Sequence, residues 1–152
     1  MRKVIFVLLC VPFLLLAGCG NSNKPEGKEI KIGNTVKLNY RNEDRPDFKI
    51  KLTGVNDFEN FIGKQKVVTF DATNISSERG NLSSFAYFSA VDQDGNELEV
   101  VDTSATGIGV YLIPNETDQL KLNIILGDNT KRAYLQIRNY LSNENIAIVK
   151  LL

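Results

Sequence analysis

The chain has 152 residues, of which 43% are hydrophobic and 24% charged, with 18 basic and 18 acidic side chains. This length is typical of a single domain. The chain contains no histidine, which excludes Ser-His-Asp triads, Cys-His pairs, histidine-ligated metal sites and imidazole pH switches.

The N-terminal segment has the pattern of a secretory signal peptide. Arg2 and Lys3 give it a positive start, and the uncharged apolar run Val4–Ala17 follows, closed by small residues. A transmembrane helix is the alternative, but a helix of this length spans roughly 21 Å, against about 30 Å of hydrocarbon core. We therefore expect residues 1–18 to be removed as a signal peptide.

The end of this segment carries a more specific motif, formed by Leu16, Ala17, Gly18 and Cys19. It resembles the lipobox of bacterial lipoproteins at all four positions. The resemblance implies cleavage between Gly18 and Cys19 and attachment of a diacylglyceryl group to the Cys19 thiol. A buried free cysteine that happens to follow these residues is the alternative. Because two acyl chains anchor a protein stably, the resemblance implies a lipid-anchored protein on the extracytoplasmic side of the cell membrane.

Cleavage would leave 152 − 18 = 134 residues with 16 basic and 18 acidic side chains, a formal charge of −2. This balance gives no reason to expect a nucleic-acid partner. Cys10 would leave with the signal peptide and Cys19 would carry lipid, so no thiol remains for a disulfide or a metal, and we expect no metal or cofactor. Residues 19–29 are rich in turn formers and predict a short flexible tether behind the lipidated N-terminus.

From residue 30 onward, apolar and polar side chains alternate almost everywhere with the period of two that predicts β-strands, and Phe85–Val91 predicts a strand that is nearly continuously apolar. Polar turns separate these runs, and no amphipathic helix longer than a turn or two is evident. We expect the run at 97–101 to pair with the run at 85–91. The predicted strands are Ile30–Ile32, Val36–Tyr40, Phe48–Leu52, Val68–Ala72, Phe85–Val91, Glu97–Val101, Leu120–Leu126, Ala133–Ile137 and Ile146–Leu152.

Short strands at regular spacing predict an all-β fold, an immunoglobulin-like antiparallel β-sandwich of about 7–9 strands over residues 30–152. A small barrel is the competing closure, and periodicity does not choose between the two. The order of strands and turns resembles the immunoglobulin-like family numbered 4352 among the domains of unknown function. The resemblance implies this fold in a surface lipoprotein of a Gram-positive bacterium, and it implies no catalytic residue. The segments that carry it are Ile32–Val36, Phe48–Val55, Val67–Asn74, Asp92–Glu97 and Ile113–Glu116.

Two aromatic residues are candidates for a binding edge. Phe58 and Phe61 stand three apart within Asn56–Gln65, a segment whose composition otherwise predicts a loop. The favoured interpretation is a short helix that caps the core. The alternative is an exposed edge of the kind that marks interaction sites.

The acidic run Asp92–Glu97 raises the question of calcium binding. If Gly95 takes the sixth position of an EF-hand loop, Ala90 and Val101 fall where the first and last acidic ligands belong, which excludes that motif. A different calcium site, formed by Asp92, Asp94 and Glu97 with or without Asp102, is the alternative. Asp-Gly between two strands instead predicts an ordinary hairpin turn, which we favour.

Three classes of function fit these observations. They are a lipid-anchored binding or interaction module with an unknown protein or cell-envelope ligand, an accessory structural protein of the cell envelope, and a small envelope hydrolase. We rank them in this order, because anchor, tether and sandwich would hold loops near the membrane surface on a rigid scaffold. The hydrolase has no nucleophile–base pair to support it, so we expect a protein that is not an enzyme.

Overall fold

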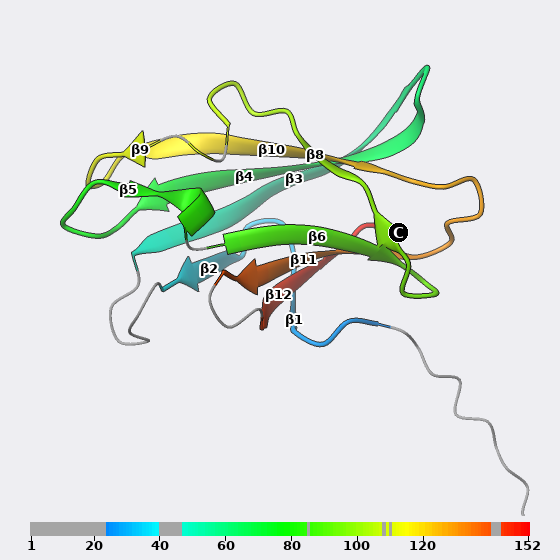
Figure 1. Cartoon of the computed structure of the whole chain (residues 1–152), viewed down its shortest axis with the longest axis horizontal. Coiled ribbons are helices and arrows are strands. Elements are labelled where there is room, and N and C mark those ends of the chain that lie inside the picture. Colours follow the sequence, from blue (N-terminus) through cyan, green and yellow to red (C-terminus); the bar gives the residue numbers. More distant parts are fainter. Residues whose placement is uncertain (1–23, 40–46, 85, 108, 110, 141–143) are drawn as a thin grey trace, which may run out of the picture.

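The computed structural model describes residues 24–39, 47–84, 86–107, 109, 111–140 and 144–152. The signal peptide and the lipobox residues Leu16, Ala17, Gly18 and Cys19 lie outside the described residues, as do Tyr40 and Phe85. Two five-stranded sheets form the body of the molecule, and a small two-stranded sheet lies at one end (Figure 1). In the described part of the chain, no helix is long and apolar enough to cross a membrane.

The first sheet has the strand order β1-β12-β11-β6-β7. All neighbours are antiparallel except β1 and β12, which pair in parallel. β1 takes in Lys28 and Glu29, two residues that the sequence pattern assigned to the tether. The strands are β1 (Lys28–Ile30), β6 (Ala86–Asp92), β7 (Glu97–Leu98), β11 (Ala133–Asn139) and β12 (Asn145–Lys150).

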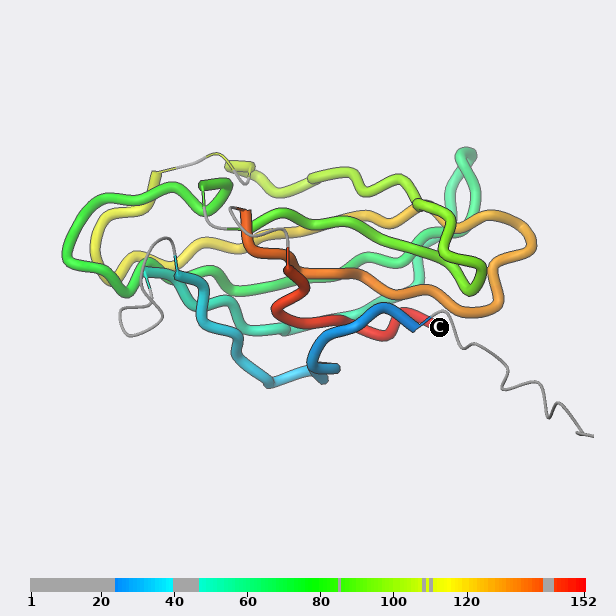
Figure 2. The backbone as a smooth tube through the Cα atoms, turned by 60° about the horizontal axis from the view of Figure 1, so that its bottom comes forward, coloured from blue at the N-terminus to red at the C-terminus, as the bar shows by residue number. Residues whose placement is uncertain are grey.

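The second sheet has the order β2-β3-β4-β10-β8 and is antiparallel throughout. β1 and β2 line a common groove and so lie at the same edge of the sandwich, and β7 and β8, separated by one residue, lie together at the other edge. Figure 2 shows β1 and β2 together along one side of the molecule. The strands are β2 (Thr35–Leu38), β3 (Phe48–Asn60), β4 (Gly63–Asn74), β8 (Val100–Asp102) and β10 (Thr117–Ile125).

The core lies between the two sheets, as the alternating pattern requires. Phe70 of β4 and Phe88 of β6 meet across it with ring centroids 5.9 Å apart and ring planes tilted by 44°. Beyond the main sheets, β5 (Gly80–Asn81) pairs with β9 (Tyr111–Leu112), and a single 3-10 turn, η1 (Leu82–Ser84), places Leu82 against the core. The largest fully buried side chains include Phe48, Phe70, Leu38, Ile50, Leu52, Ile124, Leu135, Ile137 and Ile148.

The all-β sandwich predicted from the sequence is confirmed, and two separate sheets rule out the barrel. The two sheets contain ten strands instead of the expected 7–9. The tenth strand arises because the run predicted as one strand, Glu97–Val101, forms two short strands, β7 and β8. The pairing predicted for Glu97–Val101 was wrong in part, because only β7 pairs with β6, whereas β8 crosses to the other sheet and pairs with β10.

Candidate interaction site

The β3–β4 hairpin extends well beyond the sandwich. Up to Leu52, β3 alternates between buried and exposed side chains, and the register with β4 then shifts between Leu52 and Gly54. A bulge of this kind bends and twists a strand. After it, β3 leaves the core but stays paired with β4 as far as Asn60 and Gly63, so the hairpin forms a projecting ribbon (Figure 1).

The tip of this hairpin is closed by Asn60, whose side-chain oxygen accepts two hydrogen bonds. The Ile62 amide donates to Asn60 Oδ1 at 2.9 Å, and Gln65 Nε2 donates to the same atom at 3.0 Å. Gly63 adopts φ 125°, a backbone conformation that side chains with a Cβ rarely allow. Gln65 is itself buried, and its Oε1 accepts a bond from Asn123 Nδ2 of β10 at 2.9 Å. The turn is therefore braced against the neighbouring strand.

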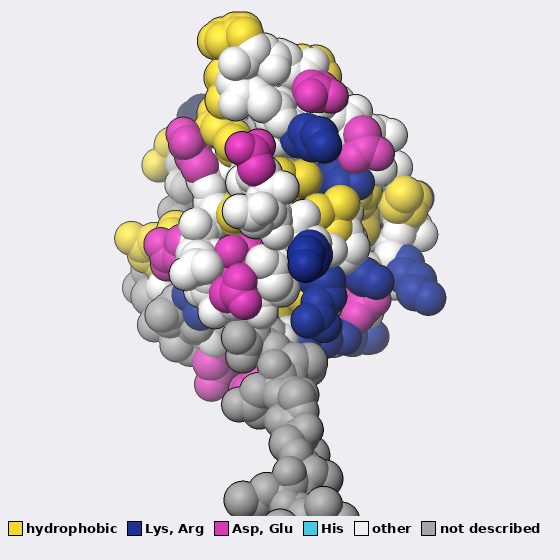
Figure 3. Space-filling model, turned by 90° about the vertical axis from the view of Figure 1, so that its right-hand side faces the viewer, with side chains coloured by type: hydrophobic (Ala, Val, Ile, Leu, Met, Phe, Trp, Pro, Cys, Tyr) yellow, Lys and Arg dark blue, Asp and Glu magenta, His cyan; other side chains and the backbone are white. Residues whose placement is uncertain are grey.

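Three large apolar side chains project from this braced tip. Phe61 is 98% exposed, Ile62 54% and Phe58 46%. Figure 3, which looks at the end of the molecule that carries the hairpin, shows hydrophobic side chains gathered at its top. These three residues, Phe58, Phe61 and Ile62, are called the hairpin tip. A group of apolar side chains that are this exposed is unusual for a monomeric protein, and such groups mark interaction surfaces.

The favoured prediction for this segment was wrong. No helix caps the core here, since Phe58 lies in β3 and Phe61 in the turn that follows it, and neither residue belongs to the buried core. The two aromatics lie together at an exposed edge, as the alternative interpretation placed them. Their role in binding stays a prediction. Ile62 was missed, because a lone isoleucine in a polar segment gives no pattern that marks it as exposed.

A groove runs along the base of the hairpin and has a volume of about 470 Å³. One wall is the hairpin, with Phe58 at its rim, and the other is the connection between β10 and β11. The Leu126 amide donates to the Lys64 carbonyl at 2.9 Å and holds the two walls together. The full lining is Asp57, Phe58, Glu59, Lys64, Gln65, Leu126, Gly127, Asp128, Thr130 and Leu152.

Charged side chains flank the hairpin tip in balanced numbers. Lys66 Nζ lies 2.7 Å from Asp57 Oδ1, and the Lys66 side chain is largely buried while Asp57 is exposed. Glu59 and Lys64 face each other across the hairpin in the strand register. The tip therefore combines an apolar end with a polar rim of both signs, the composition of a protein-binding surface.

The acidic run Asp92–Glu97 forms the turn between β6 and β7, as the hairpin interpretation predicted. Asp92 organises this turn: its Oδ1 accepts bonds from the amides of Asp94 and Asn96 at 2.8 and 2.9 Å, and its Oδ2 accepts from Asn96 Nδ2 at 3.0 Å. The bond from the Asn96 side chain is the main reason that the pKa of Asp92 lies below its usual range. Among the described residues, no group of three or more Asp, Glu, His or Cys side chains is placed to hold a metal ion.

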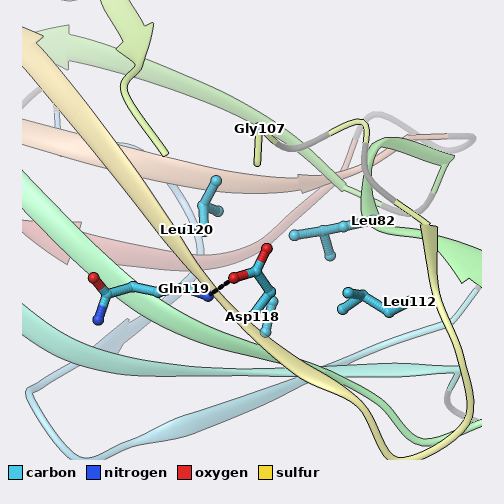
Figure 4. Close-up of a pocket in the computed structure, with 7 residues that line it drawn as sticks. Leu82, Gly107, Leu112, Asp118, Gln119 and Leu120 are labelled. Carbon is cyan, nitrogen blue, oxygen red and sulfur yellow. Dashed lines mark hydrogen bonds between the residues drawn. The ribbon is translucent and has the colours of Figure 1, made fainter. Parts of the chain in front are cut away.

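A small pocket under the loop that follows β8 is too small for a substrate. Figure 4 shows Leu82, Leu112 and Leu120 around the Asp118 side chain. The volume is about 10 Å³, at the lower limit for a single water molecule. Asp118 is engaged structurally, since its carboxylate accepts bonds from the Gln119 amide at 2.8 Å and from the Thr106 hydroxyl.

A second groove, of about 300 Å³, opens beside β6 and was not anticipated. Exposed Tyr87 and Tyr140 stand at its mouth, and core residues Phe88 and Leu122 form part of its floor. Tyr87 belongs to the run Phe85–Val91, which is almost continuously apolar, so the sequence did not predict its exposure. That Tyr140 comes to the same groove depends on the tertiary fold.

Comparison with known proteins identifies the fold. An uncharacterised β-sandwich protein from Clostridium difficile 630 is similar, with a TM-score of 0.60 and 14% identity over 84% of this chain and 95% of that one. MPT63, a secreted protein from Mycobacterium tuberculosis, is similar with a TM-score of 0.53 and 15% identity over 85% and 99% of the two chains. No family model and no curated protein matches the chain. The β-sandwich is thus shared, while the lipobox and the membership of family 4352 stay predictions.

Proposed function

We propose that the protein is a lipid-anchored interaction module of the cell surface and that the hairpin tip binds its partner, a protein or another ligand of the cell envelope. The single observation that carries the proposal is the 98% exposure of Phe61 at the end of a fully paired ribbon. An aromatic side chain held by a rigid scaffold loses little conformational entropy on binding, and such residues dominate binding energy at interfaces. The groove beside Phe58 gives a partner a concave surface next to this anchor.

The location rests on the N-terminal motif. Leu16–Cys19 supports lipid attachment at Cys19, and the scaffold occurs in the secreted protein MPT63, which is compatible with a place outside the cytoplasm. We propose a binding role and no enzymatic one. The similar proteins carry no description of an activity, and the chain has no histidine to serve as a general base at neutral pH.

The binding role is tested with the hairpin double variant Phe58→Ser/Phe61→Ser. The acylated protein is cross-linked in the native envelope and recovered by an affinity tag, and the cross-linked species are compared with those of the unchanged protein. We expect a defined adduct whose yield falls at least about tenfold in the variant, because central aromatic residues of an interface contribute about 2 kcal/mol or more. Circular dichroism establishes that the variant is folded.

The matched control is Ile32→Ser/Ile113→Ser, which removes two equally exposed apolar side chains, 61% and 58% exposed, from other parts of the surface. This control should leave the adduct unchanged. Equal loss in both variants would show that the adduct reports general surface hydrophobicity. An adduct that a folded hairpin variant retains in full would place the binding site elsewhere.

Anchoring has its own test. With Cys19→Ser the diacylglyceryl group has no thiol to receive it, so we expect the protein to move from the detergent-rich to the aqueous phase on phase separation. An ordinary signal peptide would predict no difference between the two proteins. Unchanged partitioning would therefore contradict the lipid anchor while leaving the hairpin proposal open to its separate test.

A further inference from the structure

Charged side chains separate onto the two long edges of the sandwich. The edge formed by β7 and β8 carries exposed Glu97, Glu99 and Asp102. The opposite edge, formed by β1, β2 and the adjoining part of β3, carries exposed lysines. In Figure 3 most of the basic side chains in view lie on one flank of the molecule, whereas acidic side chains are found on both. The basic edge is defined as Lys28, Lys31, Lys37, Lys49 and Lys51.

Lysines of the basic edge are placed directly against one another. Lys37 of β2 lies opposite Lys49 of β3 in the strand register, and like charges at such positions repel. Lys51 lies on the same face, opposite Asp71 of β4. The ion pairs within the described part of the chain are Lys24–Glu29 and Lys66–Asp57, and neither includes a residue of the basic edge. In β1, β2 and the adjoining part of β3, the one acidic side chain is Glu29, which pairs with Lys24 and also attracts Lys31. The five lysines therefore still give the edge a positive excess.

A groove crosses this edge where the two sheets meet. Its volume is about 350 Å³, and Lys28 of the first sheet and Lys37 of the second both line it. Asn34 and Thr35 add polar groups to the same walls. Lysine ammonium groups and a threonine hydroxyl are donors that a phosphate group accepts, and residues of both kinds line this groove. The remaining lining is aliphatic: Ile30, Val36, Ile146 and Ala147.

The start of the described chain lies against the same sheet as β1. Gly27, at φ 131°, packs so closely that an added Cβ would come within 3.3 Å of side-chain atoms of both Asn145 and Ile148. Lys24 Nζ bonds Glu29 Oε2 at 2.6 Å, and this bond keeps the pKa of Glu29 below its usual range. From Cys19 to Lys24 the chain reaches at most about 18 Å when fully extended. A lipid on Cys19 would therefore hold this side of the domain close to the bilayer.

We propose that the basic edge docks on anionic phospholipid headgroups of the membrane that holds the anchor, with a headgroup phosphate between Lys28 and Lys37. The docking rests on the lipid anchor of the proposed function, which brings the lysines within range of a surface potential that decays over about 8 to 10 Å. Acyl chains and a basic surface are complementary membrane signals. The hairpin tip lies away from this edge, and docking would leave it free for its partner (Figure 2).

The test uses the acylated protein reconstituted on two sets of vesicles, one of pure phosphatidylcholine and one that also contains phosphatidylglycerol. Lysines are acetylated briefly and the rate at each site is measured by mass spectrometry. On the anionic vesicles we expect the basic edge to react at least about threefold more slowly than on the neutral ones, since each lysine near an anionic surface gains about fivefold in attraction. Exposed Lys64 and Lys131 should react at the same rate on both.

A charge variant sharpens this test. Lys37→Gln/Lys49→Gln should remove most of the protection of Lys28 and Lys31, whereas the control Lys64→Gln/Lys131→Gln should preserve it. Equal rates for the basic edge on both vesicle types would overturn the docking. So would protection that extends equally to Lys64 and Lys131, or protection that millimolar inorganic phosphate reproduces without vesicles, which would show a site for small anions.

Flotation of the vesicles separates this proposal from the lipid anchor. Protein that floats with both vesicle types is anchored, and its labelling then decides the docking. Protein that floats with anionic vesicles alone would support the docking and contradict the anchor. Protein that floats with neither type would overturn both.

Discussion

The two ends of strand β4 carry opposite exceptions to the rule that apolar side chains are buried and polar ones exposed. At one end, beside Gly63, the hairpin tip holds Phe61 at 98% exposure, and at the other end Asn74 is fully buried. Both placements are costly in isolation, because exposed aromatic surface orders water and a buried amide loses its hydrogen bonds to water. At the Asn74 end, hydrogen bonds within the protein offset this cost. At the Phe61 end, no packing among the described residues offsets it.

Asn74 is compensated completely by its neighbours. Its Nδ2 donates to the carbonyls of Glu78 and Leu112 at 2.7 and 2.8 Å, and its Oδ1 accepts from the Ser76 amide and hydroxyl at 2.9 and 2.8 Å. Its backbone amide also donates to the Glu116 carbonyl at 3.0 Å. These bonds tie the end of β4 to the segments on either side of it. A buried polar or exposed apolar residue is structural where neighbouring groups satisfy it, and it suggests a function where they do not.

The largest effect is expected midway between these two ends, at Phe70. Phe70→Ala removes a fully buried ring that packs against Phe88, so we expect a loss of about 3–5 kcal/mol in the free energy of unfolding. Urea denaturation followed by circular dichroism measures this loss. A loss below about 1 kcal/mol would mean that the two sheets do not pack through this ring as described.

Asn74→Ala should cost somewhat less, about 2–4 kcal/mol, because it leaves the buried Leu112 carbonyl without this donor and removes an acceptor from Ser76. Thermal and urea denaturation measure the difference. Asn56→Ala, at an exposed position of β3, is the control and should change stability by no more than about 0.5 kcal/mol. If Asn74→Ala were as stable as Asn56→Ala, the hydrogen bonds of Asn74 would not offset the cost of its burial, and the two ends of β4 would not differ in this respect.

Phe61→Ser should change the free energy of unfolding by no more than about 0.5 kcal/mol, because the side chain that it shortens is almost wholly in water. Denaturation of the isolated protein checks this, without a partner present. A loss comparable with that of Phe70→Ala would show that the ring packs against the protein and would remove the basis for a binding role.

The smallest effect concerns the β6–β7 turn, which lies apart from both ends of β4. The hydrogen bond from the Asn96 side chain lowers the pKa of Asp92 in the folded protein below its ordinary value of 3.8. The carboxylate therefore adds stability above this value, and the contribution is lost as pH falls through the lower pKa of the folded state. Asp92→Asn should be slightly less stable than the unchanged protein at neutral pH, with the difference shrinking toward about pH 3. Melting temperatures over this range measure it, and a difference that grows on acidification would contradict the role of the carboxylate.

The strands in the centre of the sandwich could be predicted from the local pattern of the chain. Phe48–Leu52, Val68–Ala72 and Leu120–Ile124 alternate with the period of two that a half-buried strand requires, and the structure buries their apolar side chains. The turn at Asp92–Glu97 was likewise predictable, because Asp-Gly has local conformational preferences that do not depend on the rest of the chain.

Tertiary structure alone decided what depends on contacts between distant segments. The ribbon beyond Leu52 is polar and lacks alternation, so pairing with β4 makes it a strand, and this pairing also turns Phe61 outward. β7 and β8 belong to different sheets, although only Glu99 lies between them in the chain. The basic edge arises because register sets Lys37 against Lys49 and the meeting of two sheets brings Lys28 beside them. Side-chain periodicity reports which residues face the core, but it contains no information on which strand lies next to which.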